Sequence, residues 1–348
     1  MFLRNRYNYL ALLFISYFLF IIINFFSLQI LNINDSIEKI DKQTYEVFYL
    51  SAPRGEIYDT NKEKLVTSSL EPHLFINLRK INDENIVQYK QYLKYNFKDL
   101  KNSDFENIFN SKELLYLVRN INDLNYLERQ SLLELDAFEI FDYPIRQYNY
   151  GNIASHIIGY IGRPTLEEFE AYPESIRNGI VGKSGVEKYY EEKLSGIAGQ
   201  IVFKGKEIID FTSPLPGEDL YLTIDIKTQR IATESLLEGI KLANENFDSE
   251  NIIQKGSIVV MDINSGEVVS MVSLPDFDPN KFVKGISTFD FDQLNRIDAF
   301  NNFAIQGLYP PGSVFKLVAY WLAENEGLFP EGIKSRNNTL KCEGKLSF

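Results

Sequence analysis

The chain has 348 residues, of which 45% are hydrophobic and 24% are charged, which is enough for roughly two globular domains. Its 48 acidic residues outnumber its 36 basic residues and give a net charge of −12, which argues against a protein that binds nucleic-acid phosphates. The single cysteine, Cys342, excludes an internal disulfide framework and a complete cysteine-based zinc module. The two histidines, His73 and His156, lie far apart, which disfavours a His-rich metalloenzyme.

The first predicted element is a membrane anchor. No charged residue lies between Arg6 and Asp35, and the segment 10–31 is apolar over the roughly 20 residues that a helix needs to cross a bilayer. Arg4 and Arg6 precede it, so the positive-inside rule places the N-terminus in the cytoplasm and the chain after Asn32 outside. The alternative is a cleaved signal peptide. Its apolar region is usually about 7–15 residues and ends in small residues, whereas this run is longer and ends in bulky ones.

Short strands and turns are predicted next, over Pro53–Thr67, because Pro, Gly, Asp and Asn separate the apolar residues there. Residues 82–140 show helical spacing, with Leu114–Val118 assigned to a helix. From Arg146 to Gly199 the chain is punctuated by glycines, and Glu187–Leu194 is predicted to be a short helix. We place a domain boundary near residue 225.

An amphipathic helix is predicted over residues 226–246, with Ile231, Leu236, Leu237 and Ile240 on one side. Two β-branched runs follow on either side of Asn264-Ser265-Gly266, a pattern typical of a β-hairpin because Asn and Gly tolerate the positive φ of the turn. A helix that can cover one face of a hairpin sheet predicts α+β packing in this second domain.

The most informative stretch is YPPGSVFKLVAYWLAENEGL, residues 309–328. Its Pro-Pro-Gly prevents a helix before Ser313, and the apolar residues that follow predict a helix that is buried on most sides. Ser313 and Lys316 lie three residues apart in the first turn and therefore on one face. Burial of Lys316 would favour its neutral amine, which can accept the hydroxyl proton of Ser313. Backbone N–H groups at the helix start would stabilise an oxyanion.

The Ser-x-x-Lys pattern alone is weak evidence, because an N-cap serine explains Ser313 equally well. Ser-x-x-Lys is, however, one of the sequence signatures of penicillin-binding proteins and serine β-lactamases.

Further motifs carry a family resemblance along nearly the whole chain. They are PRGEIYDTNKEKLV (53–66), RQYNYGNIASHIIGYIG (146–162), GKSGVEKYYEEKLSGIAG (182–199), LTID (222–225), the strand pair VVMDINSGEVVSMVSLPDFDPN (259–280) and YPPGSVFK (309–316). With these motifs the chain resembles the class B penicillin-binding proteins, and Pro311 favours their elongation type. Thr60, Asn149 and Phe303 depart from the residues usual in the family.

The resemblance implies a peptidoglycan D,D-transpeptidase that cross-links stem peptides through an acyl-enzyme on Ser313, with Lys316 as base and the Ser313 N–H in the oxyanion hole. It implies an α+β fold with three parts: tail and anchor (1–34), an elongated non-catalytic pedestal (35–225), and the N-terminal part of a transpeptidase domain of the serine β-lactamase type (226–348). It places the protein in the bacterial inner membrane as a single-pass protein, with its bulk in the periplasm. The implied partners are stem peptides, β-lactams, a SEDS-type glycan polymerase and elongation scaffold proteins, with no nucleic acid.

The family's Ser-x-Asn and Lys-Thr-Gly motifs are expected well beyond the nucleophile. Ser335-Arg336-Asn337 follows Ser313 too closely, and Lys183-Ser184-Gly185 precedes it, so we interpret both as coincidences of letters. We therefore expect the 348 residues to be truncated within the transpeptidase domain and inactive alone, with Phe315, Val318 and Trp321 of the Ser313 helix exposed because the late strands of the family's sheet are missing. The alternatives are a membrane-anchored binding or regulatory module and a β-lactamase or β-lactam sensor.

Metal binding is left open at one residue. Cys342 is either an incidental cysteine or the first ligand of the structural zinc that some family members carry; catalysis itself requires no cofactor. For His156 the resemblance implies a structural hydrogen bond in the pedestal.

Overall fold

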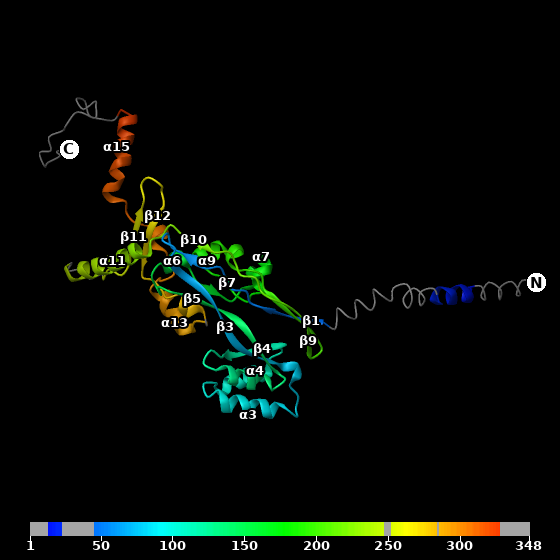
Figure 1. Ribbon diagram of the computed structural model, residues 1–348. Coiled ribbons are helices and arrows are strands. Elements are labelled where there is room, and N and C mark those ends of the chain that lie inside the picture. The colour runs from blue at the N-terminus through cyan, green and yellow to red at the C-terminus, as the bar shows by residue number, and fades with distance from the viewer. Residues whose placement is uncertain (1–12, 23–44, 247–251, 284, 328–348) are drawn as a thin grey trace, which may run out of the picture.

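The structure is a computed structural model, and it describes residues 13–22, 45–246, 252–283 and 285–327. The described part is elongated, and the segment that carries Ser313 lies at the opposite end from residues 13–22 (Figure 1). Residues 13–22 form an exposed helix, while the rest of the predicted anchor 10–31 lies outside the described residues. Among the residues that are described, no helix is both long enough and apolar enough to cross a membrane.

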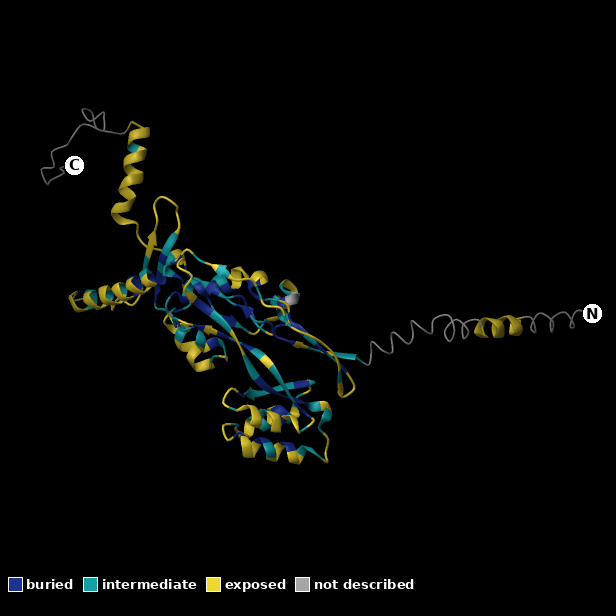
Figure 2. Cartoon of the chain, in the orientation of Figure 1, coloured by how far each residue is buried: buried dark blue, intermediate teal, exposed yellow. Residues whose placement is uncertain are grey.

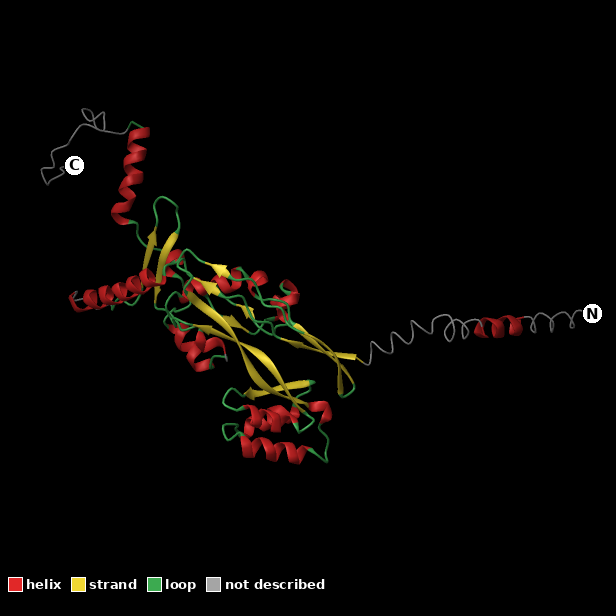
Figure 3. Ribbon diagram, in the orientation of Figure 1, coloured by secondary structure: helices red, strands yellow, loops and turns green. Residues whose placement is uncertain are grey.

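A long antiparallel strand pair forms the centre of the pedestal. Strand β3 (Lys64–Asn77) pairs with β5 (Phe138–Tyr148), from Val66 opposite Tyr148 to Ile76 opposite Phe138. The sheet is completed by β2 (Ile57–Tyr58), β4 (Leu115–Asn120) and β10 (Leu220–Tyr221), in the order β10-β2-β3-β4 with β5 on β3. Strands β3 and β5 run the length of the pedestal and connect its two ends (Figure 3).

A second sheet contains β1 (Tyr45–Leu50), β8 (Gly199–Lys204) and β9 (Glu207–Thr212), in the order β1-β8-β9. Its buried face packs Leu50, Ile201 and Phe203 against Phe75 of β3 and Leu115 of β4.

Helices cover the end of the β3–β5 pair at which Ile76 lies opposite Phe138. They are α3 (Ile86–Asn96), α4 (Asn102–Asn110) and α5 (Tyr126–Leu133), with the short 3₁₀ turn η2 (Leu78–Lys80) beside them in the chain. The helix predicted over Leu114–Val118 is wrong, because Leu115–Asn120 is strand β4. Leu115 and Leu117 pack into the cluster around Phe75, whereas Tyr116 and Val118 pack into the one around Phe138. A strand that is apolar on both faces lacks the alternating pattern that would distinguish it from a buried helix.

The glycine-punctuated segment folds into short elements, namely α6 (Ser155–Ile158), β6 (Ile161–Gly162), α7 (Leu166–Ala171), α8 (Pro173–Ile176), β7 (Val181–Gly182), α9 (Gly185–Tyr189) and α10 (Glu191–Leu194). The helix predicted at Glu187–Leu194 is confirmed as α9 and α10. Gly159 has a φ of +82°, and a Cβ built on it would lie 1.8 Å from the Ser184 carbonyl oxygen. Only glycine permits this approach of the two loops.

The C-terminal region, residues 226–327, begins with the long helix α11 (Ile226–Asn246) and the hairpin of β11 (Gly256–Met261) and β12 (Val268–Leu274). Both predictions are confirmed, and Gly266 in the turn has a φ of +77°. The predicted apolar face of α11 is only half right. Leu236 and Ile240 pack on Val272 and Leu274, but Ile231 and Leu237 are 63% and 51% exposed.

The remaining elements are α12 (Asn280–Val283), α13 (Thr288–Arg296), α14 (Phe303–Gln306), the 3₁₀ turn η3 (Gly312–Phe315) and α15 (Lys316–Asn325). The boundary near residue 225 stays a prediction. Across it, Ile226 packs into the same buried cluster as Ile57, Leu65, Val66 and Leu194.

Candidate active site

The Ser-x-x-Lys segment begins directly after Pro310-Pro311-Gly312. Gly312 has a φ of +53°, Ser313 lies in the 3₁₀ turn η3, and Lys316 is the first residue of α15. Ser313 therefore lies in a 3₁₀ turn rather than in the first turn of an α-helix. The two residues still lie within one helical turn of each other, as the spacing predicts.

In the part of the chain that the structure describes, this apolar helix is exposed, as expected for the 348 residues alone. Phe315 and Trp321 are 55% and 62% exposed, and the helix stands clear of the rest of the molecule (Figure 2). Ser313 and Lys316 are exposed as well, and no hydrogen bond joins these two described side chains. In this conformation Lys316 therefore lacks the burial that its predicted role as base invokes. The apolar pattern predicts a covering surface, and the described residues do not supply it.

The chain that leads to the nucleophile is held on β12. Ser273 Oγ donates to the Asn301 carbonyl oxygen at 3.1 Å and accepts from the Phe303 N–H at 2.9 Å. Asn302 caps α14, since its Oδ1 accepts from the Ala304 N–H at 3.1 Å. The segment ten residues before Ser313 is thereby fixed to the sheet.

Strand β12 is fixed in turn by Gln229 of α11, which is 1% exposed. Gln229 Oε1 accepts from the Met271 N–H at 2.8 Å and from Ser270 Oγ at 2.9 Å, and its Nε2 donates to the Met271 carbonyl at 2.8 Å. A buried amide whose donor and acceptor are both used specifies one position of the helix on the sheet.

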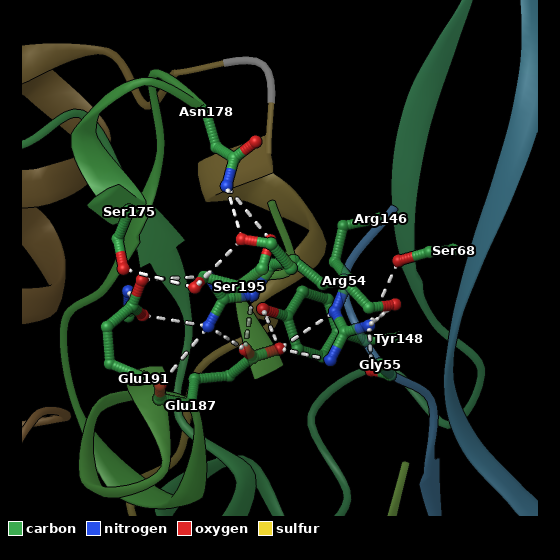
Figure 4. A network of polar contacts seen from close by, with 12 residues as sticks. Arg54, Gly55, Ser68, Arg146, Tyr148, Ser175, Asn178, Glu187, Glu191 and Ser195 are labelled. Carbon is green, nitrogen blue, oxygen red and sulfur yellow. Dashed lines mark hydrogen bonds and ion pairs between the residues drawn. The ribbon is translucent and has the colours of Figure 1, made fainter. Parts of the chain in front are cut away.

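A buried ionic network lies in the pedestal (Figure 4). Arg54 Nε donates to Glu187 Oε2 at 3.0 Å, and its Nη2 donates to Glu191 Oε2 at 2.9 Å. Arg146 Nε donates to Glu187 Oε1 at 2.8 Å, and Tyr148 Oη donates to the same oxygen at 3.2 Å. Each of these charged groups is almost fully removed from solvent, so the charges are tolerated only because they are paired and hydrogen-bonded.

The electrostatics of this network follow from burial and pairing. Burial alone would raise the pKa of Glu187, but the guanidiniums of Arg146 and Arg54 outweigh it and lower that pKa. For Arg54, burial opposes the charge, and the carboxylates of Glu187 and Glu191 overcome it and raise the pKa. Burial raises the pKa of Tyr148 well above its usual value.

The network joins three of the motifs found in the sequence. Arg54 belongs to the segment 53–66, Arg146 and Tyr148 to the segment 146–162, and Glu187 and Glu191 to the segment 182–199. Sequence reasoning found these motifs but missed that their charges meet. The available signal was charged residues of opposite sign within separate family motifs.

The pedestal histidine forms the structural hydrogen bond that was predicted. His156 Nε2 lies 2.8 Å from the Ala299 carbonyl oxygen, and burial lowers the pKa of His156. The zinc hypothesis is untested, because Cys342 lies outside the described residues, as do Ser335 and Asn337. Within the described ranges, no three His, Cys, Asp or Glu side chains are grouped to hold a metal ion.

Comparison with protein families identifies the class. Residues 49–222 match the penicillin-binding protein dimerisation domain, and residues 256–345 match the penicillin-binding protein transpeptidase domain. The chain belongs to the penicillin-binding protein family.

Individual curated proteins similar to the chain include peptidoglycan D,D-transpeptidases. The chain is 29% identical over 307 residues to the peptidoglycan D,D-transpeptidase MrdA of Acinetobacter baumannii, covering 83% of this chain and 43% of that protein. It is 28% identical over 341 residues to MrdA of Escherichia coli K12, covering 92% of this chain and 50% of that protein. The chain thus spans about half the length of these relatives.

A solved structure agrees with this assignment. The penicillin-binding protein PBP2 of Helicobacter pylori, in its complex with MreC, superposes with a TM-score of 0.65 at 25% identity. The match covers 85% of this chain and 54% of that one.

Proposed function

We propose that the protein is a peptidoglycan D,D-transpeptidase of cell-wall elongation, with Ser313 as nucleophile and Lys316 as its base. The observation that carries this proposal is the placement of Ser313 and Lys316 within one helical turn, directly after Pro310-Pro311-Gly312, inside the segment that matches the transpeptidase domain.

The proposed reaction follows from those two side chains. Ser313 Oγ attacks the penultimate D-Ala carbonyl of a stem peptide while its proton passes to Lys316 Nζ, and the Ser313 N–H stabilises the oxyanion. The terminal D-Ala leaves with a proton, and an acyl-enzyme ester remains on Ser313. The amine of a neighbouring stem then attacks this ester, forms the cross-link and releases the serine. A β-lactam acylates the same oxygen and opens its ring.

Covalent labelling with a fluorescent penicillin tests the assignment, on this chain and on any longer product of its reading frame. We expect Ser313→Ala to abolish labelling and Lys316→Ala to slow it by at least about 10²-fold. Val314→Ala, at an exposed neighbouring position, is the control that should label normally. Undiminished labelling of Ser313→Ala would refute the role, and rapid hydrolysis of the penicillin would favour the β-lactamase alternative.

We expect the 348-residue chain itself to be labelled poorly, because the described residues leave α15 in solvent and do not form the walls of a pocket around it. Loss of one oxyanion donor alone costs about 10²–10³ in rate. Stoichiometric labelling of this chain within minutes would contradict that expectation. The well-packed pedestal beside an exposed α15 also supports the second candidate, a membrane-anchored binding or regulatory module.

The proposal includes location and partners. We infer a single-pass inner-membrane protein with its N-terminus in the cytoplasm, supported by the apolar segment 10–31 after Arg4 and Arg6. A reporter enzyme fused after residue 225 should be active only if it is exported from the cytoplasm. Reporter activity in the cytoplasm would contradict this topology. An MreC-like scaffold is the proposed partner of the pedestal, supported by the similarity to the PBP2 of the MreC complex; a SEDS-type polymerase is proposed on the family resemblance.

A further inference from the structure

The pedestal touches the C-terminal region through residues 152–160, which include α6. Asn152 Nδ2 donates to Asp276 Oδ2 at 2.8 Å, and His156 reaches the Ala299 carbonyl across 143 positions of sequence. The ring of Tyr160 packs against Phe282, with ring centroids 4.1 Å apart. Three side chains from nine consecutive residues, 152–160, thus meet the segment between β12 and α14.

The contact of His156 differs from the other two because its partner is a backbone carbonyl group. A carbonyl oxygen only accepts hydrogen bonds, so Nε2 of His156 carries the proton and donates it. The imidazole and Phe277 rings pack in a T-shaped arrangement, with centroids 5.4 Å apart and an interplanar angle of 78°. Ala299, whose carbonyl accepts, is fully buried. The direction and the position of this hydrogen bond are therefore both fixed.

Ala299 begins the segment that leads to the nucleophile. The residue before it, Asp298, has a φ of +55°, so the chain turns sharply there. Asn301 and Phe303 are fixed on Ser273 of β12, and α14 and the Pro-Pro-Gly turn follow. The segment 299–303 is consequently held by the pedestal at one end and by the sheet at the other. No other described side chain of the pedestal donates to its carbonyl groups.

We propose that His156 is a positioning residue, whose hydrogen bond to the Ala299 carbonyl sets the place of the segment that delivers Ser313. The effect on acylation rests on the proposed function, whereas the effect on the segment does not. By this contact the pedestal contributes to the placement of the nucleophile without touching substrate.

A matched set of variants separates this role from a general loosening of the domain contact. Gln carries its amide nitrogen four bonds from Cα, as far as Nε2 of histidine, so His156→Gln keeps the donor. His156→Asn carries its nitrogen one bond closer and loses the contact. Asn280→Ala removes a different bridge, in which Asn280 exchanges two hydrogen bonds of 2.9 Å with the backbone of Tyr148 and does not touch residues 299–303.

Hydrogen exchange measured by mass spectrometry on the 348-residue chain is the first test. We expect His156→Asn to speed exchange of peptides covering 299–306 by about tenfold, the effect of one lost hydrogen bond, while His156→Gln stays near the parent rate. Asn280→Ala should speed exchange near residues 148 and 280 but leave 299–306 unchanged. Equal exchange in the Asn and Gln variants would overturn the proposal, and so would the same acceleration at 299–306 in Asn280→Ala.

Acylation kinetics are the second test, in whichever form of the protein a penicillin labels. The acylation rate constant should fall about tenfold in His156→Asn and recover in His156→Gln, with the noncovalent dissociation constant for penicillin unchanged. An unaltered rate constant despite faster exchange would overturn the link to Ser313. If no form is labelled, the proposed function fails, and the exchange experiment still decides whether His156 places the segment.

Discussion

The pedestal and the Ser313 helix contain similarly apolar segments, yet they differ in how these are packed. In the pedestal, β3 contributes Leu74 and Ile76 to a fully buried cluster, and even the charged Arg54 and Glu187 are inside. In α15, Val318 and Trp321 lie in solvent. An apolar sequence thus determines which residues need burial, but the covering surface must come from other segments, and in the pedestal those segments are present.

The largest expected effect comes from breaking the ionic network of the pedestal. Glu187→Gln would leave the buried guanidiniums of Arg54 and Arg146 without their shared counter-charge, and we expect the free energy of unfolding to fall by about 3–5 kcal/mol. The measurement is urea denaturation followed by circular dichroism. Glu192→Gln, an exposed residue of α10, is the matched control and should change stability by less than about 0.5 kcal/mol. Similar effects of the two substitutions would contradict the network's role.

A matched pair of Leu→Ala substitutions tests the contrast in packing directly. Leu74→Ala in the pedestal core should cost about 2–5 kcal/mol, because it opens a cavity among fully buried neighbours. Leu317→Ala in α15, where the side chain is 74% exposed, should cost less than about 0.5 kcal/mol. A large loss in the second variant would show that α15 is packed in solution.

Gly159→Ala tests whether the loop contact between α6 and α9 depends on glycine. Gly159 has a φ of +82°, and an added Cβ would overlap the Ser184 carbonyl oxygen. We expect the free energy of unfolding of the pedestal, measured by thermal denaturation, to fall by about 2–4 kcal/mol. Gly179→Ala separates the two causes. Its φ is +72°, but nothing lies near the added Cβ, so it should cost only about 1 kcal/mol.

The smallest expected effect concerns the contact between the two domains. Burial raises the pKa of Asp276 to about 6, against 3.8 in an unfolded chain, and the hydrogen bond from Asn152 offsets only part of this. Between about pH 4 and pH 6 the folded state therefore holds a proton that the unfolded chain has lost. The contribution of Asp276 to stability falls as the pH rises through this range and stays low above it.

Asp276→Asn should consequently raise the free energy of unfolding above pH 6 by about 1 kcal/mol, a value discounted for the partial exposure of this carboxyl. The gain should shrink as the pH falls from 6 to 4. Subtracting the parent's pH profile removes the opposite contribution of His156, whose pKa is lowered. Asp83→Asn, at an exposed position, is the control. A gain that does not vary with pH would show that the carboxyl is not the cause.

The sequence by itself determined the elements that depend on neighbours in the chain. Helix α11 and the β11–β12 hairpin follow from apolar periodicity and from the Asn264-Ser265-Gly266 turn. Ser313 and Lys316 share a helical turn because they lie three residues apart after Pro-Pro-Gly. The motifs along the chain were enough for the family. These features are local, so a pattern of a few residues carries them.

Only the tertiary structure decided the features that depend on distant segments. Leu115–Asn120 is a strand because β3 pairs with it and two core clusters cover its faces. Arg54, Arg146 and Glu187 form one network because the sheet and α9 bring them together, and His156 reaches Ala299 because the two domains are in contact. Burial depends on which surfaces meet, and no periodicity within a helix specifies its partner.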